Sequence, residues 1–204
     1  MTTTFDFNDG NGPVPAHKHS NGGGWIADTT TVVDTAYVGP DARVYDNAEV
    51  YANAMIYGEA KVHGNAMVYG KARVYDNAWV YGKARVYGNA MVYGKAKVHG
   101  NTRVYDNAWV YNKARVYDNA RVSGNAMVYG NAMVSGNTIV FGNAMVYAKF
   151  MIYGKAEEKS DTNEDIFIEM NGKRYKLVEV EKSWTSSIYI LILLHVPNGI
   201  VIST

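Results

Sequence analysis

The stretch ARVYGNAMVYGKAKVHGN, residues 84–101, contains one six-residue pattern three times in succession. The same phase runs without a gap from residue 42 to residue 155 as 19 hexads. It extends back less regularly to residue 24, where Val38, Val32 and Ile26 hold the aliphatic position, and the total becomes 22. A short unbroken repeat predicts a solenoid, in which each repeat packs on its neighbours and none folds alone.

Each position of the hexad has a physical role. The third residue is Val in 17 of the 19 clear hexads and the first is Ala in 16, so both are expected to point inward. Because strand side chains alternate between faces, the second residue and the fourth, mostly Tyr, are expected outside. The fifth residue is Gly in 12 hexads and Asp or Asn in 5, which are the types that tolerate positive φ. The pattern predicts a four-residue strand followed by a two-residue turn.

The repeat Val-x-x-x-Ala-x resembles the hexapeptide-repeat family of left-handed parallel β-helices. Together with the resemblance of residues 6–25 given below, it covers about three quarters of the chain. Tyr stands where that family often has Gly. The resemblance implies a left-handed, triangular coil of 18 residues and a homotrimer. The 22 hexads would then form about seven coils, a rod roughly 35 Å long. The segment DFNDGNGPVPAHKHSNGGGW, residues 6–25, also resembles the start of uncharacterised phage and prophage hexapeptide proteins, which implies a phage-encoded protein.

The chain divides into four parts around this repeat. Residues 1–23 are expected to form an irregular N-terminal cap, residues 24–155 the β-helix and residues 156–164 a polar linker. Residues 165–204 are expected to form a small C-terminal β domain for capping or interaction, with a hairpin turn at Asn171-Gly172. Phe150 replaces the usual Ala and could plug the end of the core.

Composition limits the compartment and the chemistry. The chain has no Cys, so a disulfide framework, a thiolate zinc site and a cysteine nucleophile are excluded. The N-terminus lacks a secretory signal and the longest apolar run, residues 188–196, is too short to cross a bilayer. We therefore expect a cytoplasmic protein without a membrane partner, or a virion component. The net charge of +1 conceals a basic rod, because residues 42–155 hold 14 Lys and Arg against 6 Asp and Glu.

An 18-residue coil sorts the outward residues into three columns, named here by their composition. The methionine face carries Met55, Arg73, Met91, Trp109, Met127 and Met145 beside Tyr57, Tyr75, Tyr93, Tyr111, Tyr129 and Tyr147. The arginine face carries Arg85, Arg103 and Arg121 beside Tyr51, Tyr69, Tyr87 and Tyr105. The mixed face carries Arg43, Lys61, Trp79, Lys97 and Arg115 beside Tyr45, His63, Tyr81, His99 and Tyr117.

The methionine face is the main candidate interface. Stacked Tyr side chains stabilise neighbouring strands by themselves, so a Tyr column alone indicates structure. The Met and Trp residues beside it are different, because an apolar strip this tall usually marks a contact surface. We expect it to serve self-association, or a protein partner that is a virion component or a host protein that this chain inhibits.

A second candidate is the column Arg85, Arg103 and Arg121, where Arg and aromatic residues alternate. Such a surface can bind nucleic acid or another anionic polymer, for example a polysaccharide. The alternative is that the cations only keep the rod soluble.

Enzymes of the hexapeptide-repeat fold, acyltransferases and gamma-type carbonic anhydrases, are the remaining alternative. The uninterrupted hexads argue against the loops that such transferases use. His63 and His99 share a face but are separated by Tyr81, so they cannot ligate one metal ion. His17 and His19 form a His-x-His pair that is more typical of a cap than of a metal site, and His195 lies in an apolar stretch. The sequence therefore predicts no cofactor, no metal and no catalytic residue.

Overall fold

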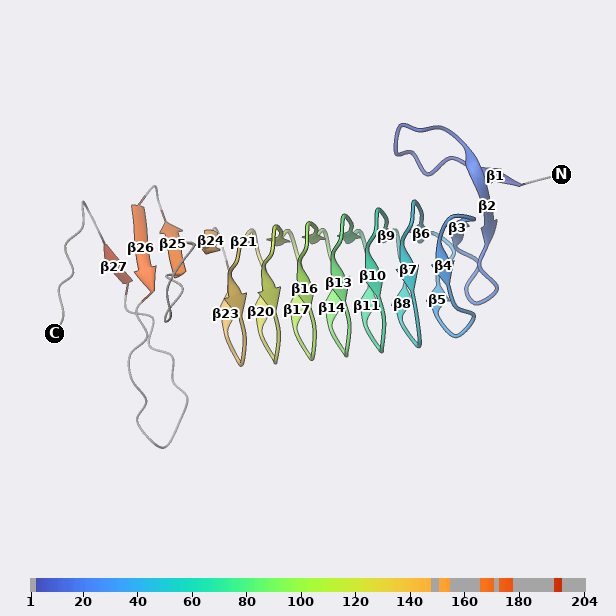
Figure 1. Ribbon diagram of the computed structural model, residues 1–204. Coiled ribbons are helices and arrows are strands. Elements are labelled where there is room, and N and C mark those ends of the chain that lie inside the picture. The colour runs from blue at the N-terminus through green and yellow to red at the C-terminus, as the bar shows by residue number, and fades with distance from the viewer. Residues whose placement is uncertain (1–2, 148–150, 155–165, 171–172, 178–192, 196–204) are drawn as a thin grey trace, which may run out of the picture.

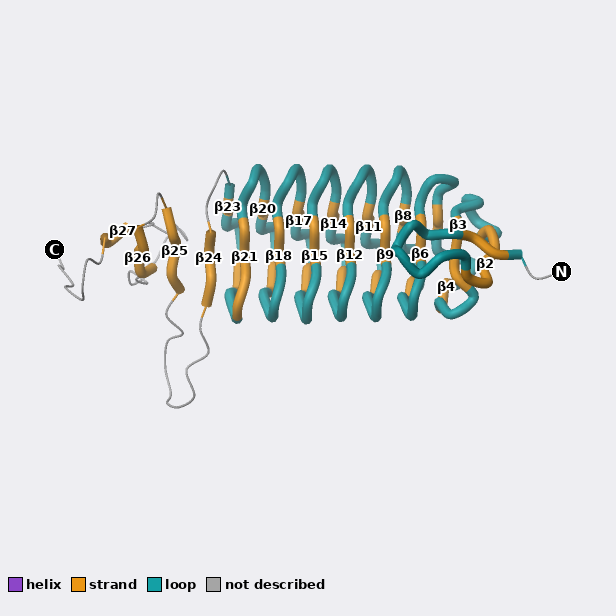
Figure 2. Tube along the Cα trace, turned by 90° about the horizontal axis from the view of Figure 1, so that it is seen from above, coloured by secondary structure: helices purple, strands orange, loops and turns teal. Residues whose placement is uncertain are grey.

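The chain folds into a straight rod of stacked coils, seen along its length in Figure 1 and turned by 90° in Figure 2. This is a computed structural model, which describes residues 3–147, 151–154, 166–170, 173–177 and 193–195, the last four ranges by their backbone only. Every regular element in these ranges is a β-strand. None of the described chain forms a helix with the length and hydrophobicity that crossing a bilayer requires.

The strands form three sheets, one for each face of the rod. The sheet of the mixed face has 13 strands in the spatial order β1 (Thr4–Phe5), β2 (Val14–Lys18), β3 (Trp25–Ala27), β6 (Arg43–Val44), β9 (Lys61–Val62), β12 (Trp79–Val80), β15 (Lys97–Val98), β18 (Arg115–Val116), β21 (Met133–Gly136), β24 (Met151–Gly154), β25 (Ile166–Met170), β26 (Lys173–Leu177) and β27 (Leu193–His195).

The other two sheets have seven strands each. On the arginine face the order is β22 (Ile139–Val140), β19 (Arg121–Val122), β16 (Arg103–Val104), β13 (Arg85–Val86), β10 (Met67–Val68), β7 (Glu49–Val50) and β4 (Thr31–Val32). On the methionine face it is β23 (Met145–Val146), β20 (Met127–Val128), β17 (Trp109–Val110), β14 (Met91–Val92), β11 (Arg73–Val74), β8 (Met55–Ile56) and β5 (Tyr37–Val38).

The register confirms the predicted coil. Paired residues such as Met67 and Arg85, or Val68 and Val86, are one coil of 18 residues apart and their strands are parallel. The first and third residues of the hexads form one continuous core, in which the Val side chains from Val38 to Val134 are 0% exposed. Thr102 and Thr138 occupy the Ala position, and their hydroxyl groups donate to the backbone carbonyls of His99 and Ser135.

The strands are shorter than predicted, because most span only the second and third residues of the hexad. The hydrogen-bond ladder nevertheless extends beyond them. The N–H of Arg85 donates to the carbonyl of Thr102 at 2.9 Å, and the N–H of Tyr87 donates to the carbonyl of Val104 at 3.0 Å. The chain must then turn within two residues, and the fifth residue does so with positive φ, for example 71° at Gly88.

Polar side chains reinforce the corners from coil to coil. An Asp at the fifth position accepts a hydrogen bond from the N–H of the Gly one coil further on, as between Asp106 and Gly124 at 3.1 Å. At the sixth position, Asn89, Asn107, Asn125 and Asn143 form a ladder of side-chain amide bonds of 3.1–3.2 Å. Corner residues therefore contribute specific bonds in addition to turn conformation.

The N-terminal cap is more regular than predicted. Strands β1 and β2 pair antiparallel, and β2 pairs antiparallel with β3, so a short hairpin extends the sheet of the mixed face. Asn21 and Gly24 cover the first strand of the methionine face by exchanging hydrogen bonds with Val38. The ring of Phe7 lies 4.9 Å from that of Tyr45, so the loop that carries Phe7 lies on the mixed face.

The C-terminal hairpin is confirmed, since β25 and β26 pair antiparallel on either side of residues 171–172. Strand β24 pairs with β21 in parallel and with β25 antiparallel, which extends the sheet of the mixed face further. Within the expected C-terminal β domain, the described residues also include β27, which pairs antiparallel with β26. Phe150 and the linker at 156–164 lie outside the described residues.

Candidate interaction faces

The methionine face is a continuous column across consecutive coils. The strand register places Met55 beside Arg73, Arg73 beside Met91, and Met91 beside Trp109. Met127 and Met145 continue the column. The structure thus brings the predicted interface residues together on one face.

The Tyr side chains of this face form a stack. Tyr57, Tyr75, Tyr93 and Tyr111 lie with ring centroids 4.8–4.9 Å apart and ring planes within 2° of parallel. Tyr129 and Tyr147 extend the stack at 5.0 and 5.6 Å. Burial, together with the neighbouring phenols, raises the pKa of Tyr75 to about 12. The rings cover each other's faces, so a ligand meets their edges.

The column is accessible. Trp109 is 38% exposed and Met145 is 59% exposed, which places both among the large apolar side chains that the rod leaves in contact with solvent. Met55, Met91 and Met127 are half-buried by their neighbours. The face is therefore an apolar surface and not part of the core.

The arginine face holds a column of like charges. Arg85 is paired with Arg103 and Arg103 with Arg121, and all three side chains are exposed. The ion pairs in the described part of the chain are His17–Asp28 and His63–Asp46, so none of the three has an acidic partner there. Tyr69, Tyr87 and Tyr105 stack beside them at 4.8 and 5.1 Å.

The mixed face contains a second aromatic stack, in which the rings of Tyr45, His63, Tyr81, His99 and Tyr117 follow one another at 4.6–5.3 Å. Tyr81 separates the two histidines, as predicted, so they do not converge on one point. Burial is the main reason why the pKa values of His63 and His99 are lowered.

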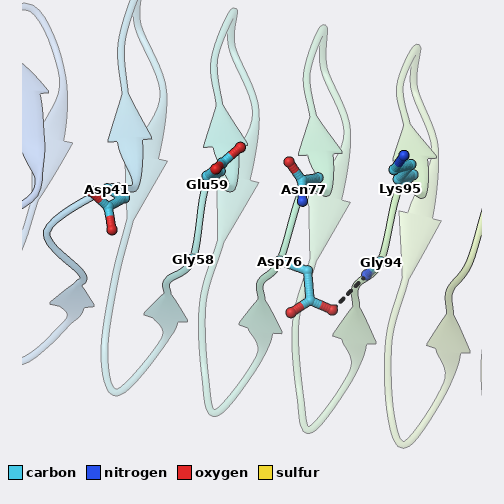
Figure 3. Close-up of a pocket in the computed structure, with 7 residues that line it drawn as sticks. All are labelled: Asp41, Gly58, Glu59, Asp76, Asn77, Gly94 and Lys95. Carbon is cyan, nitrogen blue, oxygen red and sulfur yellow. Dashed lines mark hydrogen bonds between the residues drawn. The ribbon is translucent and has the colours of Figure 1, made fainter.

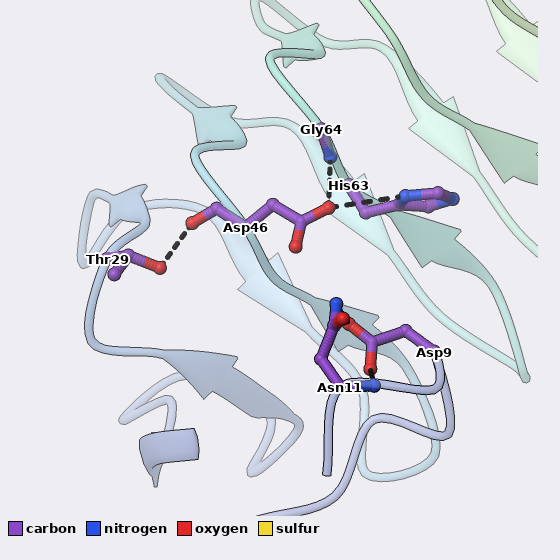
Figure 4. A network of polar contacts seen from close by, with 6 residues as sticks. All are labelled: Asp9, Asn11, Thr29, Asp46, His63 and Gly64. Carbon is purple, nitrogen blue, oxygen red and sulfur yellow. Dashed lines mark hydrogen bonds and ion pairs between the residues drawn. The ribbon is translucent and has the colours of Figure 1, made fainter. Parts of the chain in front are cut away.

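His63 has a polar setting that links neighbouring coils, with Asp9 of the N-terminal loop nearby (Figure 4). The Oδ2 of Asp46 lies 3.5 Å from Nδ1 of His63 and accepts the N–H of Gly64 at 2.9 Å. The charges of Asp46 and Asp9 raise the pKa of His63 and that of Lys61 lowers it, but burial outweighs them. The hydroxyl of Thr29 donates to the carbonyl of Asp46.

Trp79 is held between two cations on this face. The Nζ atoms of Lys61 and Lys97, on the strands either side, lie 4.9 and 4.6 Å from its ring. Such cation–π contacts stabilise the side chains concerned. Trp79 therefore has two cation–π contacts, whereas the described contact of the Trp109 ring is edge-on to Tyr93 at 6.5 Å.

The two histidines of the cap, His17 and His19, lie in different environments. The Nδ1 of His17 is 2.7 Å from Oδ1 of Asp28, and His17 is exposed. His19 is 4% exposed, and its Nδ1 lies 3.1 Å from the carbonyl of Asn21. No group of three His, Asp or Glu side chains suited to a metal ion occurs in the residues that the structure describes.

One further feature was not found from the sequence. The corner between the methionine face and the mixed face, here the charged edge, carries Asp41, Glu59, Asn77, Lys95, Lys113 and Asn131 in that order. Figure 3 shows the first four side by side along the rod, lining an open depression. A second depression continues the first past Lys113 to Asn131. The edge is thus acidic towards the N-terminus and basic towards the C-terminus.

Comparison with known proteins agrees with the architecture. The family described as YdcK beta solenoid repeat matches residues 84–100, 114–129 and 126–141. These stretches lie in the central and later coils, and the chain is similar to that repeat there. No curated protein matches the chain. The match and the fold together make this chain a β-solenoid repeat protein.

Proposed function

We propose that this protein is a non-catalytic structural rod that associates with other protein surfaces through its methionine face, first of all with further copies of itself. The observation that carries the proposal is the column beside the outer Tyr stack, in which five of the six residues from Met55 to Met145 are Met or Trp and Arg73 is the exception. Met adapts to irregular partners, and Trp is frequent at the centre of protein interfaces. Burial of this strip would remove a large apolar surface from water.

The shape of the rod supports the same function. Its coils stack in a straight row (Figure 1), and the strand register continues the outward column of the methionine face from Met55 to Met145. Both depressions described above are open and lie at a corner, and neither is enclosed by loops between the coils. Flat columns suit contact with another extended surface.

The phage resemblance of residues 6–25 suggests the setting. A phage-encoded rod would meet either a virion component or a host protein in the bacterial cytoplasm, and obstruction of a host protein would need only a rigid surface. The hexapeptide-repeat resemblance implies a homotrimer as one form of this self-association, and the mass of the assembly decides between a trimer and a pair.

The test is to change the centre of the methionine face and measure mass by light scattering. Trp109→Glu with Met127→Glu places charge in the strip, and we expect the oligomer to dissociate while the circular dichroism spectrum is retained. Trp79→Glu is the matched control, since it changes the same residue type at the same hexad position on the mixed face. A monomeric wild-type protein, or a double variant with the wild-type mass, would refute self-association through this face.

A second function rests on Arg85, Arg103 and Arg121. Like charges in register repel one another, so an anionic polymer lying along the column would relieve the repulsion and add affinity. The candidate ligands are nucleic acid and acidic polysaccharide. The exposed edges of the Tyr stack beside the column offer little ring surface for stacking, so this function would depend on charge.

A further inference from the structure

The charged edge has its acidic and basic side chains in an order that bears on the orientation of two associated copies. In chain order its exposed side chains are Asp41, Glu59, Asn77, Lys95, Lys113 and Asn131, and Asp76 lies next to Asn77. The Oδ2 of Asp76 accepts the N–H of Gly94 at 3.1 Å, which keeps this carboxylate at the corner (Figure 3). The acidic groups precede the basic ones along the chain. The edge of one copy is therefore complementary in charge to the edge of a second copy that runs in the opposite direction.

We infer that two copies of this chain pair antiparallel through the methionine face, with the charged edges of the two copies side by side. The inference rests on the proposed self-association and adds the orientation of the copies. A two-fold axis in the plane of the face and perpendicular to the rod reverses the direction of the second copy. It leaves the charged edge on the same side, so the charged edge of one copy meets that of the other.

The charges also select a register. When the axis passes between β11 and β14, Glu59 lies opposite Lys113 of the second copy. Asn77, with the Asp76 carboxylate beside it, lies opposite Lys95 of the second copy. Symmetry doubles both contacts, and no like charges face each other along the edge. In this register Arg73 faces Met91, whereas an axis through β11 would place Arg73 against its own copy.

The same register matches the apolar column. Met55 faces Trp109 of the second copy. The flexible and polarisable side chain of Met55 can therefore pack against the indole ring of Trp109. Tyr57 faces Tyr111, and Tyr75 faces Tyr93. The first six coils of each copy overlap, which buries most of the methionine face in one isologous contact, the commonest form of closed assembly.

A parallel arrangement lacks this complementarity. A two-fold axis along the rod would place the charged edge opposite the corner between the arginine and methionine faces. There Glu59 would meet Asn53, and Lys95 would meet Asn89. A three-fold axis along the rod also keeps all copies parallel, so neither arrangement brings the acidic half of the edge to the basic half.

The first test exchanges charges. Glu59→Lys alone and Lys113→Glu alone each turn two attractive contacts into repulsive ones, and we expect each to raise the dissociation constant of the dimer by on the order of tenfold. The double variant Glu59→Lys with Lys113→Glu restores attraction, so its dissociation constant should return towards the wild-type value. Lys83→Glu, at the same hexad position on another corner, should have no effect. The differences should shrink as salt is added.

The second test uses the absence of cysteine from the chain, which makes introduced thiols unambiguous. Glu59 and Lys113 are three coils apart in one copy, roughly 14 Å, so cysteines at these positions cannot bridge within a chain. We expect Glu59→Cys with Lys113→Cys to form a covalent dimer on mild oxidation, and either single variant to remain mostly unlinked.

The outcomes separate this inference from the proposed function. A wild-type trimer, or an oligomer that Trp109→Glu with Met127→Glu dissociates but that ignores the charge exchange, would overturn the antiparallel pair and leave association through the methionine face intact. A double-cysteine variant that links no faster than the single variants would overturn it too. A wild-type monomer would overturn both.

Discussion

Replacement of Val86 by Asp tests the inward columns that the whole fold depends on. Val86 is 0% exposed and lies in β13, between β10 and β16 near the middle of the rod. Loss of the buried Val side chain costs about 1.5–3 kcal/mol. A carboxyl group in its place has no partner in the Val and Ala core, which costs about 1–3 kcal/mol more even when it is protonated.

The total of about 2.5–6 kcal/mol is a large part of the whole stability of a typical domain, about 5–15 kcal/mol. We therefore expect Val86→Asp to be unfolded or aggregated, and Val86→Ala to unfold in urea with a loss of about 2 kcal/mol. The matched control is Arg85→Asp on the same strand, which is exposed and relieves repulsion with Arg103. Circular dichroism during urea and thermal unfolding measures all three. A soluble Val86→Asp protein that melts with the wild type would refute the inward assignment.

Three further predictions concern pH, the corners and the arginine column. Burial lowers the pKa values of His63 and His99 from the ordinary 6.5, so the unfolded chain binds more protons in acid. Stability should be full above about pH 6.5 and fall as the pH decreases, and His63→Tyr with His99→Tyr should flatten this dependence in thermal melts. Gly82→Ala should cost about 2 kcal/mol in urea unfolding, because φ is 73° and a Cβ would lie 3.0 Å from the N of Gly100; an unchanged midpoint would contradict the corner geometry. Replacing all three column arginines by Ser should abolish any salt-dependent retention on heparin or single-stranded DNA without unfolding the rod, whereas wild-type protein that is not retained would leave the cations a solubility role.

Most of the rod could be predicted from the sequence because its physics repeats. Val at the third position and Ala at the first recur with one period, and a single strand geometry satisfies them all, so the core follows from any one coil. The faces follow too, once 18 residues complete a turn. The four-residue strand predicted from a single hexad is too long. The chain leaves the extended conformation soon after residues such as Val86, because it must form the corner.

The parts that sequence reasoning missed depend on contacts that do not repeat. Phe7, in the non-repetitive N-terminal cap, stacks on Tyr45 of the repeated aromatic column of the mixed face. Because Phe7 lies outside the repeat, the periodicity of the sequence does not predict this contact. The hydrogen bond from Gly124 to the carboxylate of Asp106 joins residues one coil apart, so it is invisible within a hexad. The charged edge was missed for the same reason. Glu59 and Lys113 are seen to lie on one corner of the rod only when the sixth position of the hexad is followed from coil to coil.

In the proposed self-association, departures from the repeat determine how the copies align. A column of identical residues can slip by one coil against another surface at little cost, since every coil offers the same contacts, just as a uniform strand can slip in register. Only residues that break the repeat can fix position and direction. In the proposed association, Trp109 and Arg73 are the residues that do so within the methionine face, and the change from Glu59 to Lys113 does so along the charged edge. If self-association has a defined register, these positions must determine it, and their substitution should alter the register or the affinity while the Val and Ala core keeps the rod folded.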